Sequence, residues 1–291
     1  MKLGFKGMHP LSEFFFYLFA FAFGLISSHP LCLITGLLCA FFYDFKLRGR
    51  KTVDFFVRII IPLIILSGLI NGLVSHFGET VLFNLPWNKP FTLESVIYGI
   101  VFSLKASSTL LWLNSFNEVV SSDKIVYLFG KFSPKIALII SMSLRFIPLI
   151  TEQSSNINTA LKGIGASEAT LKFKGKIKSA AKRLSVLVSW SLERGIDTSS
   201  SMKARGYGLK GRTVYNPYGF SFKDILLIFM LLTGCAAFFL SGKTLTATYN
   251  PETLIPFPDI KGFISWTVFT VILLFPLILD FSEEKKWSIS V

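Results

Sequence analysis

Long apolar runs separated by short polar connections dominate the chain. The longer runs approach the roughly 20 residues that an α-helix needs to cross about 30 Å of hydrocarbon. They predict six membrane-spanning helices, at residues 14–26, 31–42, 57–74, 96–113, 225–240 and 263–279. The first two runs are joined only through the sequence Ser-Ser-His-Pro at 27–30, which predicts a helical hairpin.

The composition agrees with this pattern. Hydrophobic residues make up 52% of the chain, 31 residues are Phe, and only 16% are charged. The mean hydropathy of +0.58 lies above the usual range of soluble proteins. We therefore expect an all-α integral membrane protein with about six transmembrane helices and, in addition, long amphipathic helices outside the bilayer.

A seventh apolar run, 136–150, is excluded as a span by charge. Cytoplasmic connections are rich in Lys and Arg, which places the second connection inside through Lys46, Arg48, Arg50, Lys51 and Arg58. If 136–150 also crossed, the largest basic segment would lie outside. We expect instead a non-spanning helix with Ser133 as N-cap and Pro134 at its first position, interrupted by Arg145 and ending near Pro148.

With six spans, both termini face the cytoplasm of a multi-pass cell-membrane protein. The N-terminal region also has features of a secretory signal, with Lys2 and Lys6 before an apolar core and Ser27 and Ser28 after it. Because cleavage would leave the remaining topology unchanged, topology does not decide the matter. The short connection to the next run favours an uncleaved first span.

The basic segment 151–212 carries twelve Lys and Arg against four acids, which supplies +8 of the net charge of +13. Apolar residues recur at helical spacing in two places, Ile150, Ile157 and Leu161, and then Ile177, Ala181, Leu184, Val188 and Leu192. Two cytoplasmic helices are predicted, ending near Gly163 and before Gly206. The chain thus divides into membrane helices at 1–115, a cytoplasmic helical region at 116–215 and two membrane helices at 216–291.

Each predicted helix end carries a cation, Lys162 in one and Arg205 in the other. Three interpretations remain open. The cations could stabilise the negative ends of the helix dipoles, typically by 0.3–1 kcal/mol. They could dock in acidic grooves of a partner, where Arg binds a carboxylate through two donors. Contact with anionic lipid is a third possibility, better suited to the Lys and Arg cluster at 172–183.

Motifs for soluble catalysis are not found. Gly242-Lys243-Thr244 resembles the end of a phosphate-binding loop, but Ala237 occupies the position of the required first Gly. The cysteines at 32, 39 and 235 lie in apolar runs without metal-ligand spacing, and the histidines at 9, 29 and 76 are scattered. We expect no catalytic or metal site, no cofactor and no nucleic-acid partner.

Several segments, in this order and spacing, resemble the transmembrane T component of energy-coupling factor importers, the EcfT or CbiQ family. The similar segments are Ile-Asn-Gly-Leu at 70–73, the loop 76–83, Lys-Phe-Ser-Pro-Lys at 131–135, Ser-Leu-Arg-Phe-Ile-Pro-Leu at 143–149, Ser-Leu-Glu-Arg at 191–194 and Met-Lys-Ala-Arg-Gly-Tyr at 202–207. The resemblance implies coupling or structural roles for Pro134, Arg145, Phe146 and Pro148.

The resemblance further implies that Ala204, Arg205 and Gly206 form the second Ala-Arg-Gly docking motif of the family. The first motif departs from the pattern, because Ile164 occupies the position of its Arg, within Lys162-Gly163-Ile164-Gly165. Either Lys162 supplies the missing cation from a different turn or this end docks through apolar contact.

As a T component, the chain would transmit motion from two ABC-type ATPase subunits to a small membrane substrate-binding (S) subunit in the lipid bilayer. That S subunit would bind a vitamin or a transition-metal ion, and the ATPase subunits would bind ATP. The chain itself would not be an enzyme. The alternatives are a conventional ABC permease subunit and a stand-alone secondary transporter; the latter is disfavoured because the spans contain almost no carboxylates for ion coupling.

Overall fold

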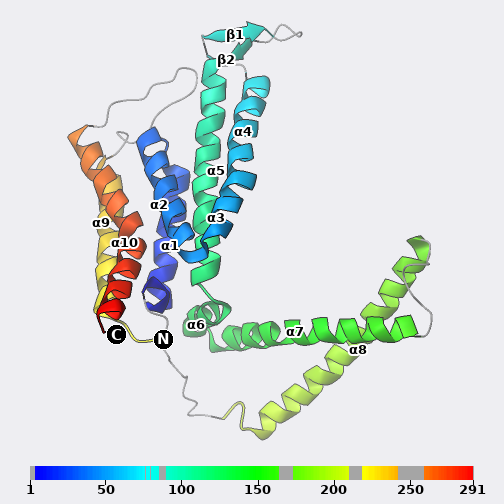
Figure 1. Ribbon diagram of the computed structural model, residues 1–291. Helices are drawn as coiled ribbons and strands as arrows, with labels where there is room; N and C mark the ends of the chain where they lie inside the picture. The colour runs from blue at the N-terminus through cyan, green and yellow to red at the C-terminus, as the bar shows by residue number, and fades with distance from the viewer. Residues whose placement is uncertain are drawn as a thin grey trace. The chain divides into compact units, whose positions relative to one another are not determined.

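The computed structural model describes residues 4–75, 77–78, 80–84, 90–163, 173–209, 218–241 and 259–290. These residues are almost entirely α-helical, which confirms the predicted all-α fold (Figure 1). Their contacts divide the chain into two compact units, 1–121 together with 218–291, and 122–217. The helices that correspond to the six predicted spans lie in the first unit, and the basic segment lies in the second.

The first unit contains seven α-helices and four short elements among its described residues. The elements are η1 (Phe5–Gly7), α1 (Pro10–Ile26), α2 (Pro30–Arg48), α3 (Arg50–Phe55), the π-helical η2 (Phe56–Ile60), α4 (Ile61–Val74), β1 (Val81–Asn84), β2 (Pro90–Thr92), α5 (Leu93–Val119), α9 (Phe222–Ser241) and α10 (Ile260–Ser290). Each of the six predicted spans therefore corresponds to a helix, generally a longer one than the apolar run indicates.

Helices α1 and α2 begin with the same N-terminal cap. His9 and His29 are the N-cap residues of α1 and α2, and in each helix a Pro follows at the first position. The Nδ1 atom of His9 accepts a hydrogen bond from the Leu11 amide at 3.2 Å, and that of His29 accepts one from Leu31 at 3.3 Å. Only residues 27–29 separate the helices, so the short connection is as predicted, but the two helices pack mainly on α5 rather than on each other.

Helix α5 packs against α1, α2 and α4. Its Trp112 is fully buried in an aromatic cluster, with ring centroids 5.4 Å from Phe16 and 6.0 Å from Tyr43. Small residues let the neighbouring helices approach α5 closely. A Cβ atom on Gly99 would lie only 2.6 Å from the Ser67 carbonyl oxygen of α4, so the two helices touch through backbone there.

A short antiparallel hairpin connects α4 to α5, with Phe83 opposite Phe91 and Val81 opposite Thr92. Beside it, Glu94 at the start of α5 accepts hydrogen bonds from the amide and the hydroxyl of Thr80, at 3.2 and 2.6 Å. The sequence pattern did not predict these strands. Glu94 is buried, and its bonds to Thr80 hold the hairpin against the N-terminal end of α5.

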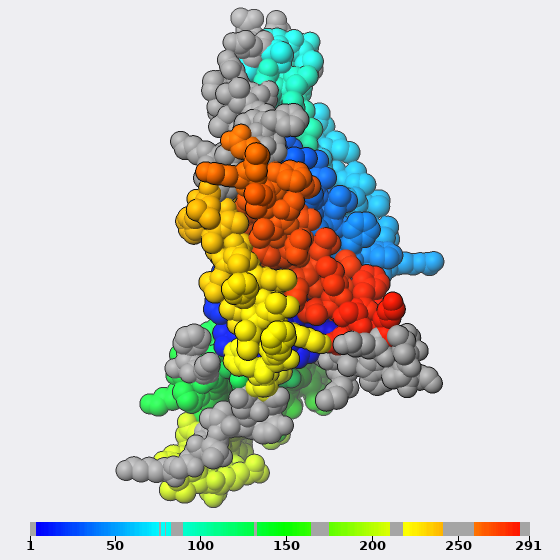
Figure 2. Space-filling model, turned by 90° about the vertical axis from the view of Figure 1, so that its left-hand side faces the viewer, coloured from blue at the N-terminus to red at the C-terminus, as the bar shows by residue number. Residues whose placement is uncertain are grey.

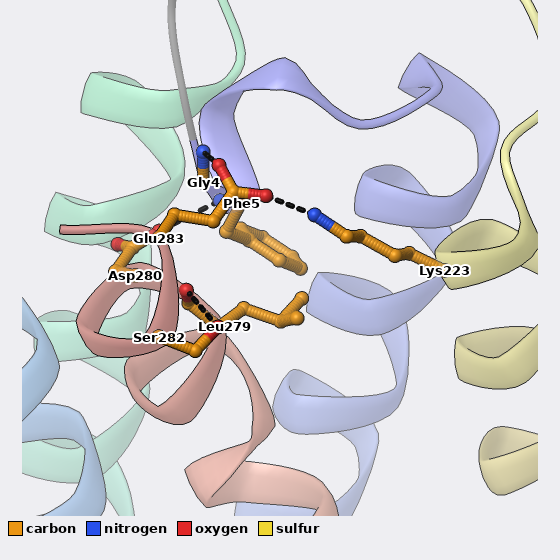
Figure 3. A network of polar contacts seen from close by, with 7 residues as sticks. All are labelled: Gly4, Phe5, Lys223, Leu279, Asp280, Ser282 and Glu283. Carbon is orange, nitrogen blue, oxygen red and sulfur yellow. Dashed lines mark hydrogen bonds and ion pairs between the residues drawn. The ribbon is translucent and has the colours of Figure 1, made fainter. Parts of the chain in front are cut away.

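The N-terminal segment is built into the first unit. The amides of Gly4 and Phe5 donate to the carboxylates of Glu283 and Asp280, and Lys223 of α9 forms an ion pair with Glu283 (Figure 3). The Phe5 ring is fully buried, 5.3 Å from the ring of Phe16. The segment therefore joins α9 and α10 to α1, and we name these residues the N-terminal clasp.

Lys105 of α5 has a polar partner on another element. Its Nζ atom donates to the hydroxyl of Ser28 at 2.9 Å, and Glu118 forms an ion pair with Lys6 at 3.1 Å. The helices bring the α1–α2 turn to the level of Lys105, which sequence spacing does not indicate.

Helices α9 and α10 pack side by side and form one face of the first unit, yellow and orange to red in Figure 2. Six described helices are long and apolar enough to cross a membrane: α2, the continuous helix Arg50–Val74, α5, α7 (Pro134–Gly163), α9 and α10. Helix α1 is shorter, at 17 residues. Since length and composition do not test sidedness, the exclusion of 136–150 as a span stays a prediction.

Candidate functional site

The second unit consists of three described helices, α6 (Ser122–Phe132), α7 (Pro134–Gly163) and α8 (Phe173–Ala204). Helix α6 packs on α7, and α7 packs on α8. The sequence analysis missed α6. The sequence signal for α6 is an amphipathic pattern between Ser122 and Pro134. Ser122 is a favourable helix start, and Pro134 ends α6 and begins α7.

Helix α7 begins as predicted. Pro134 is its first residue, and the carbonyl of Ser133 accepts the first helical hydrogen bond, from the Ala137 amide at 3.1 Å. A Pro at this position is favourable because the first amide of a helix has no intrahelical partner. Pro134 itself is exposed.

The predicted helix end near Pro148 is wrong, because α7 continues through this residue to Gly163. A Pro inside a helix removes one hydrogen bond and crowds the carbonyl four residues before it. Here helical turns continue on both sides, and the Thr151 hydroxyl bonds to the Pro148 carbonyl at 2.7 Å. The two helices expected before and after Pro148 therefore form one helix of 30 residues.

The side chains predicted to couple motion lie along this helix. Arg145 and Pro148 are exposed, and Phe146 between them is half-buried. None of the residues of α7 is buried. Because α7 has no buried side chain, its apolar N-terminal half is open to contact with lipid or with another subunit.

Large apolar side chains are also exposed along α8. They recur at an interval of seven residues and then at intervals of four, over about five turns of the helix, at Ile177, Leu184, Val188, Leu192 and Ile196. Each is between 50% and 68% exposed. Since the interval keeps them on one side of the helix, they form a continuous apolar stripe.

The C-terminal end of α8 is a Schellman motif, in which two hydrogen bonds and a left-handed residue close the helix. The Gly206 amide donates to the Lys203 carbonyl and the Tyr207 amide to the Met202 carbonyl, both at 3.0 Å. Gly206 has φ +81°, which L-residues rarely adopt. This confirms the predicted helix end and identifies Ala204, Arg205 and Gly206 as the last helical residue, the C-cap and the left-handed residue.

Arg205 is exposed at this cap, with its backbone held by the two closing hydrogen bonds and by its own amide, which bonds to Ser201 at 3.1 Å. A second left-handed residue, Gly208 with φ +100°, follows. Arg205 is thus exposed at a helix end that hydrogen bonds close.

The other helix end is described only in part. Lys162 and Gly163 are exposed at the end of α7, whereas Ile164 and Gly165 lie outside the described residues, as does the Gly-Lys-Thr sequence at 242–244. Helices α7 and α8 cross, and their C-terminal ends lie apart (Figure 1). The structure therefore gives the second unit two separate helix ends with a cation at each.

Within the described part of the chain, no group of three His, Cys, Asp or Glu side chains could hold a metal ion. Cys32 and Cys39 are buried in α2, and Cys235 is exposed on α9. His9 and His29 serve as helix caps.

Comparison with known proteins gives the family. The CbiQ family, described as cobalt transport protein, matches residues 8–215. The energy-coupling factor transporter transmembrane protein EcfT of Exiguobacterium sibiricum is 29% identical over 213 residues, which is 68% of this chain and 80% of that protein. The EcfT proteins of Bacillus subtilis and Bacillus selenitireducens are 26% and 27% identical, over 68% and 77% of this chain and 75% and 86% of their own lengths. The chain therefore belongs to the CbiQ family and is a multi-pass transmembrane component of an energy-coupling factor transporter.

Proposed function

We propose that the chain couples two ABC-type ATPase subunits to a separate membrane S subunit, which binds a vitamin or a transition-metal ion. The ATPase subunits bind the ends of α7 and α8, and their ATP-driven closure moves these ends relative to each other. The chain needs no cofactor of its own, since the partners hold ATP. Both termini and the second unit face the cytoplasm.

The observation that carries the proposal is the end of α8. A Schellman motif holds Arg205 as an exposed C-cap, so its guanidinium can enter an acidic groove with little loss of backbone freedom. A carboxylate there would bind through two parallel hydrogen bonds. This favours docking over simple capping, because Lys203 is also in the last turn and already complements the helix dipole.

The end of α7 forms the second docking contact. It offers the exposed cation of Lys162 next to Gly163 and, in the sequence, Ile164 and Gly165. Its chemistry differs from that of the Arg205 end. The ATPase groove that receives it therefore binds a Lys ammonium group or an apolar side chain in place of a guanidinium.

The apolar surfaces of α7 and α8 are the contact for the S subunit. None of the described side chains on either helix is buried, yet large aliphatic residues such as Ile139, Leu184 and Leu192 are each more than 60% exposed. Helices of this length with a continuous apolar stripe are stable when a partner covers that stripe. A small, hydrophobic membrane subunit is the partner that such a surface fits.

The unbroken course of α7 through Pro148 makes it a lever between the two contacts. Movement at Lys162 is carried along one helix to Arg145, Phe146 and Pro134 at its beginning. Pro148 lacks an amide hydrogen, so it is the position where this helix bends most easily.

The proposal is tested by charge reversal followed by purification in mild detergent and mass spectrometry of the bound subunits. Arg205→Glu is expected to abolish ATPase recruitment and uptake, because losing a buried charge pair typically costs roughly 2–5 kcal/mol, which is about 30-fold or more in affinity. Lys182→Glu makes the same change in net charge at an exposed position within α8 and is expected to leave recruitment intact.

Normal recruitment and uptake in Arg205→Glu would refute the docking assignment. Recovery of the wild-type chain alone, active in uptake without partners, would show a stand-alone transporter. Recovery of ATPase subunits without a small membrane subunit would indicate a conventional ABC permease.

A further inference from the structure

A basic cluster lies in the first unit, at the corner where α2 turns into α3, away from the coupling helices in sequence. Arg50 and Lys51 begin α3, and Arg58 follows in the π-helical segment η2. All three side chains are exposed. Among the described residues none of them forms an ion pair, in contrast to Lys46, which binds Glu284 at 3.0 Å. We name Arg50, Lys51 and Arg58 the corner cations.

The corner that carries these cations is held rigidly. Gly49 turns the chain with φ +59°, and the Thr52 hydroxyl then donates to the buried carboxylate of Asp44 at 2.8 Å. Phe56 packs edge-on against Phe41 of α2, with ring centroids 5.1 Å apart. The first turn of α3 therefore has one orientation, and its cations project outward from it.

Arg58 occupies an unusual position for a charged residue. It is the second residue of the apolar run 57–74, inside a helix long and apolar enough to span a membrane. Its sequence neighbours Val57 and Ile59 are 53% and 46% exposed, so exposed apolar side chains lie to either side of Arg58 around the helix. Arginine at such a boundary extends toward the headgroup region, where it binds phosphate.

The charge balance of the cluster is positive. Asp54 is the only acid between residues 45 and 60, and it is exposed and outside any ion pair among the described residues. Its spacing of four residues from both Arg50 and Arg58 places it on their side of the helix. The three corner cations and Asp54 together carry +2.

We propose that the corner cations bind the phosphate group of a bilayer phospholipid, with preference for an anionic headgroup, through Arg50, Lys51 and Arg58. The exposed Val57 and Ile59 beside Arg58 contact the acyl chains of the same lipid, and this combination selects an amphiphile over a soluble anion. Basic residues directly at the end of a membrane helix attract anionic lipids by about 1 kcal/mol each.

The test measures lipid retention by native mass spectrometry of the full-length chain. The protein is released from mixed micelles that contain phosphatidylglycerol and phosphatidylcholine with the same acyl chains. The wild-type chain is expected to retain phosphatidylglycerol preferentially. Arg58→Gln is expected to reduce this preference about five-fold, because one cation contributes about 1 kcal/mol.

Asp54→Asn provides a change in the opposite direction. It removes the one acid on that side of the helix and is expected to raise the preference several-fold, whereas damage to the fold would lower it. The control is Lys261→Gln, which removes an exposed cation at the start of α10. This variant is expected to keep the wild-type preference.

Four outcomes would overturn the proposal. One is equal retention of the two lipids by the wild-type chain, and another is an unchanged preference in Arg58→Gln. The third is displacement of phosphatidylglycerol by inorganic phosphate at millimolar concentration, which would identify a site for a soluble anion. The fourth is the loss of only a co-purifying membrane protein in Arg58→Gln, which would show that Arg58 binds a protein carboxylate.

Discussion

Replacing Gly206 by Ala should open the end of α8 without touching any other contact of that helix. Gly206 has φ +81°, and a Cβ atom there would lie 3.0 Å from Leu209 Cδ1. Gly195, in the interior of the same helix, has no atom within 4 Å of such a Cβ. The two Gly→Ala variants therefore add the same methyl group to one helix in two different backbone conformations.

The expected effects have opposite signs. A left-handed conformation costs an L-residue roughly 1–2 kcal/mol, so Gly206→Ala should weaken the Schellman motif by this amount. At Gly195 the helical conformation suits Ala better than Gly, by about 0.5–1 kcal/mol. The first variant therefore raises the population of the open helix end by a factor of about 5–30, and the second leaves the end closed.

Amide hydrogen exchange measures this opening directly. The reporter is the Tyr207 amide, which donates to the Met202 carbonyl at 3.0 Å in the closed end. After correction for the intrinsic exchange rate, its protection should fall about 5–30-fold in Gly206→Ala and stay at the wild-type level in Gly195→Ala. ATPase recruitment should fall in parallel, because Arg205 loses its fixed position. Equal protection of Tyr207 in both variants would refute the reasoning.

Three further predictions concern other parts of the chain. Gly99→Ala should destabilise the first unit by roughly 1–3 kcal/mol, because its Cβ would meet the Ser67 backbone at 2.6 Å. Each kcal/mol should lower the melting temperature in detergent by about 2–4 °C. Gly36→Ala, whose Cβ would lie 3.5 Å from its nearest neighbour, is the matched control and should keep the wild-type melting temperature. Phe5→Ala should destabilise the first unit by about 3–5 kcal/mol because the ring is fully buried, and chemical denaturation that reports less than 1 kcal/mol would contradict the clasp. Ile164→Arg should tighten ATPase recruitment in the purification assay, and no gain would indicate that the α7 end docks through apolar contact.

The features that the sequence predicted correctly depend on local chemistry. The apolar runs predicted the membrane helices because burial in hydrocarbon is decided by each segment's own length and composition. Pro134 marked the start of α7 and Gly206 the end of α8, because each residue restricts or releases its own backbone dihedral angles. The side chain of Arg205 could therefore be placed on a helix cap before any tertiary contact was known.

The wrong and missing predictions involve contacts that spacing does not encode. Pro148 was expected to end a helix, but the lost hydrogen bond is one among many in a helix of 30 residues. The bond between Lys105 and Ser28, at 2.9 Å, joins residues that lie 77 positions apart, and residue spacing gives no signal for it. In the first case the surrounding helix overrode a local rule, and in the second the two residues meet only once the helices have assembled.

By itself, the sequence determined that this chain is an all-α membrane protein with a basic helical insertion, and where the two cationic helix ends lie along it. Only the tertiary structure decided that α7 is one unbroken helix, that Phe5 is held by Asp280 in the N-terminal clasp, and that α4 touches α5 through Gly99. The physical reason is the range of the interactions. Hydropathy and capping act within a few residues, whereas close packing and polar networks join residues that are distant along the chain and meet only when the helices assemble.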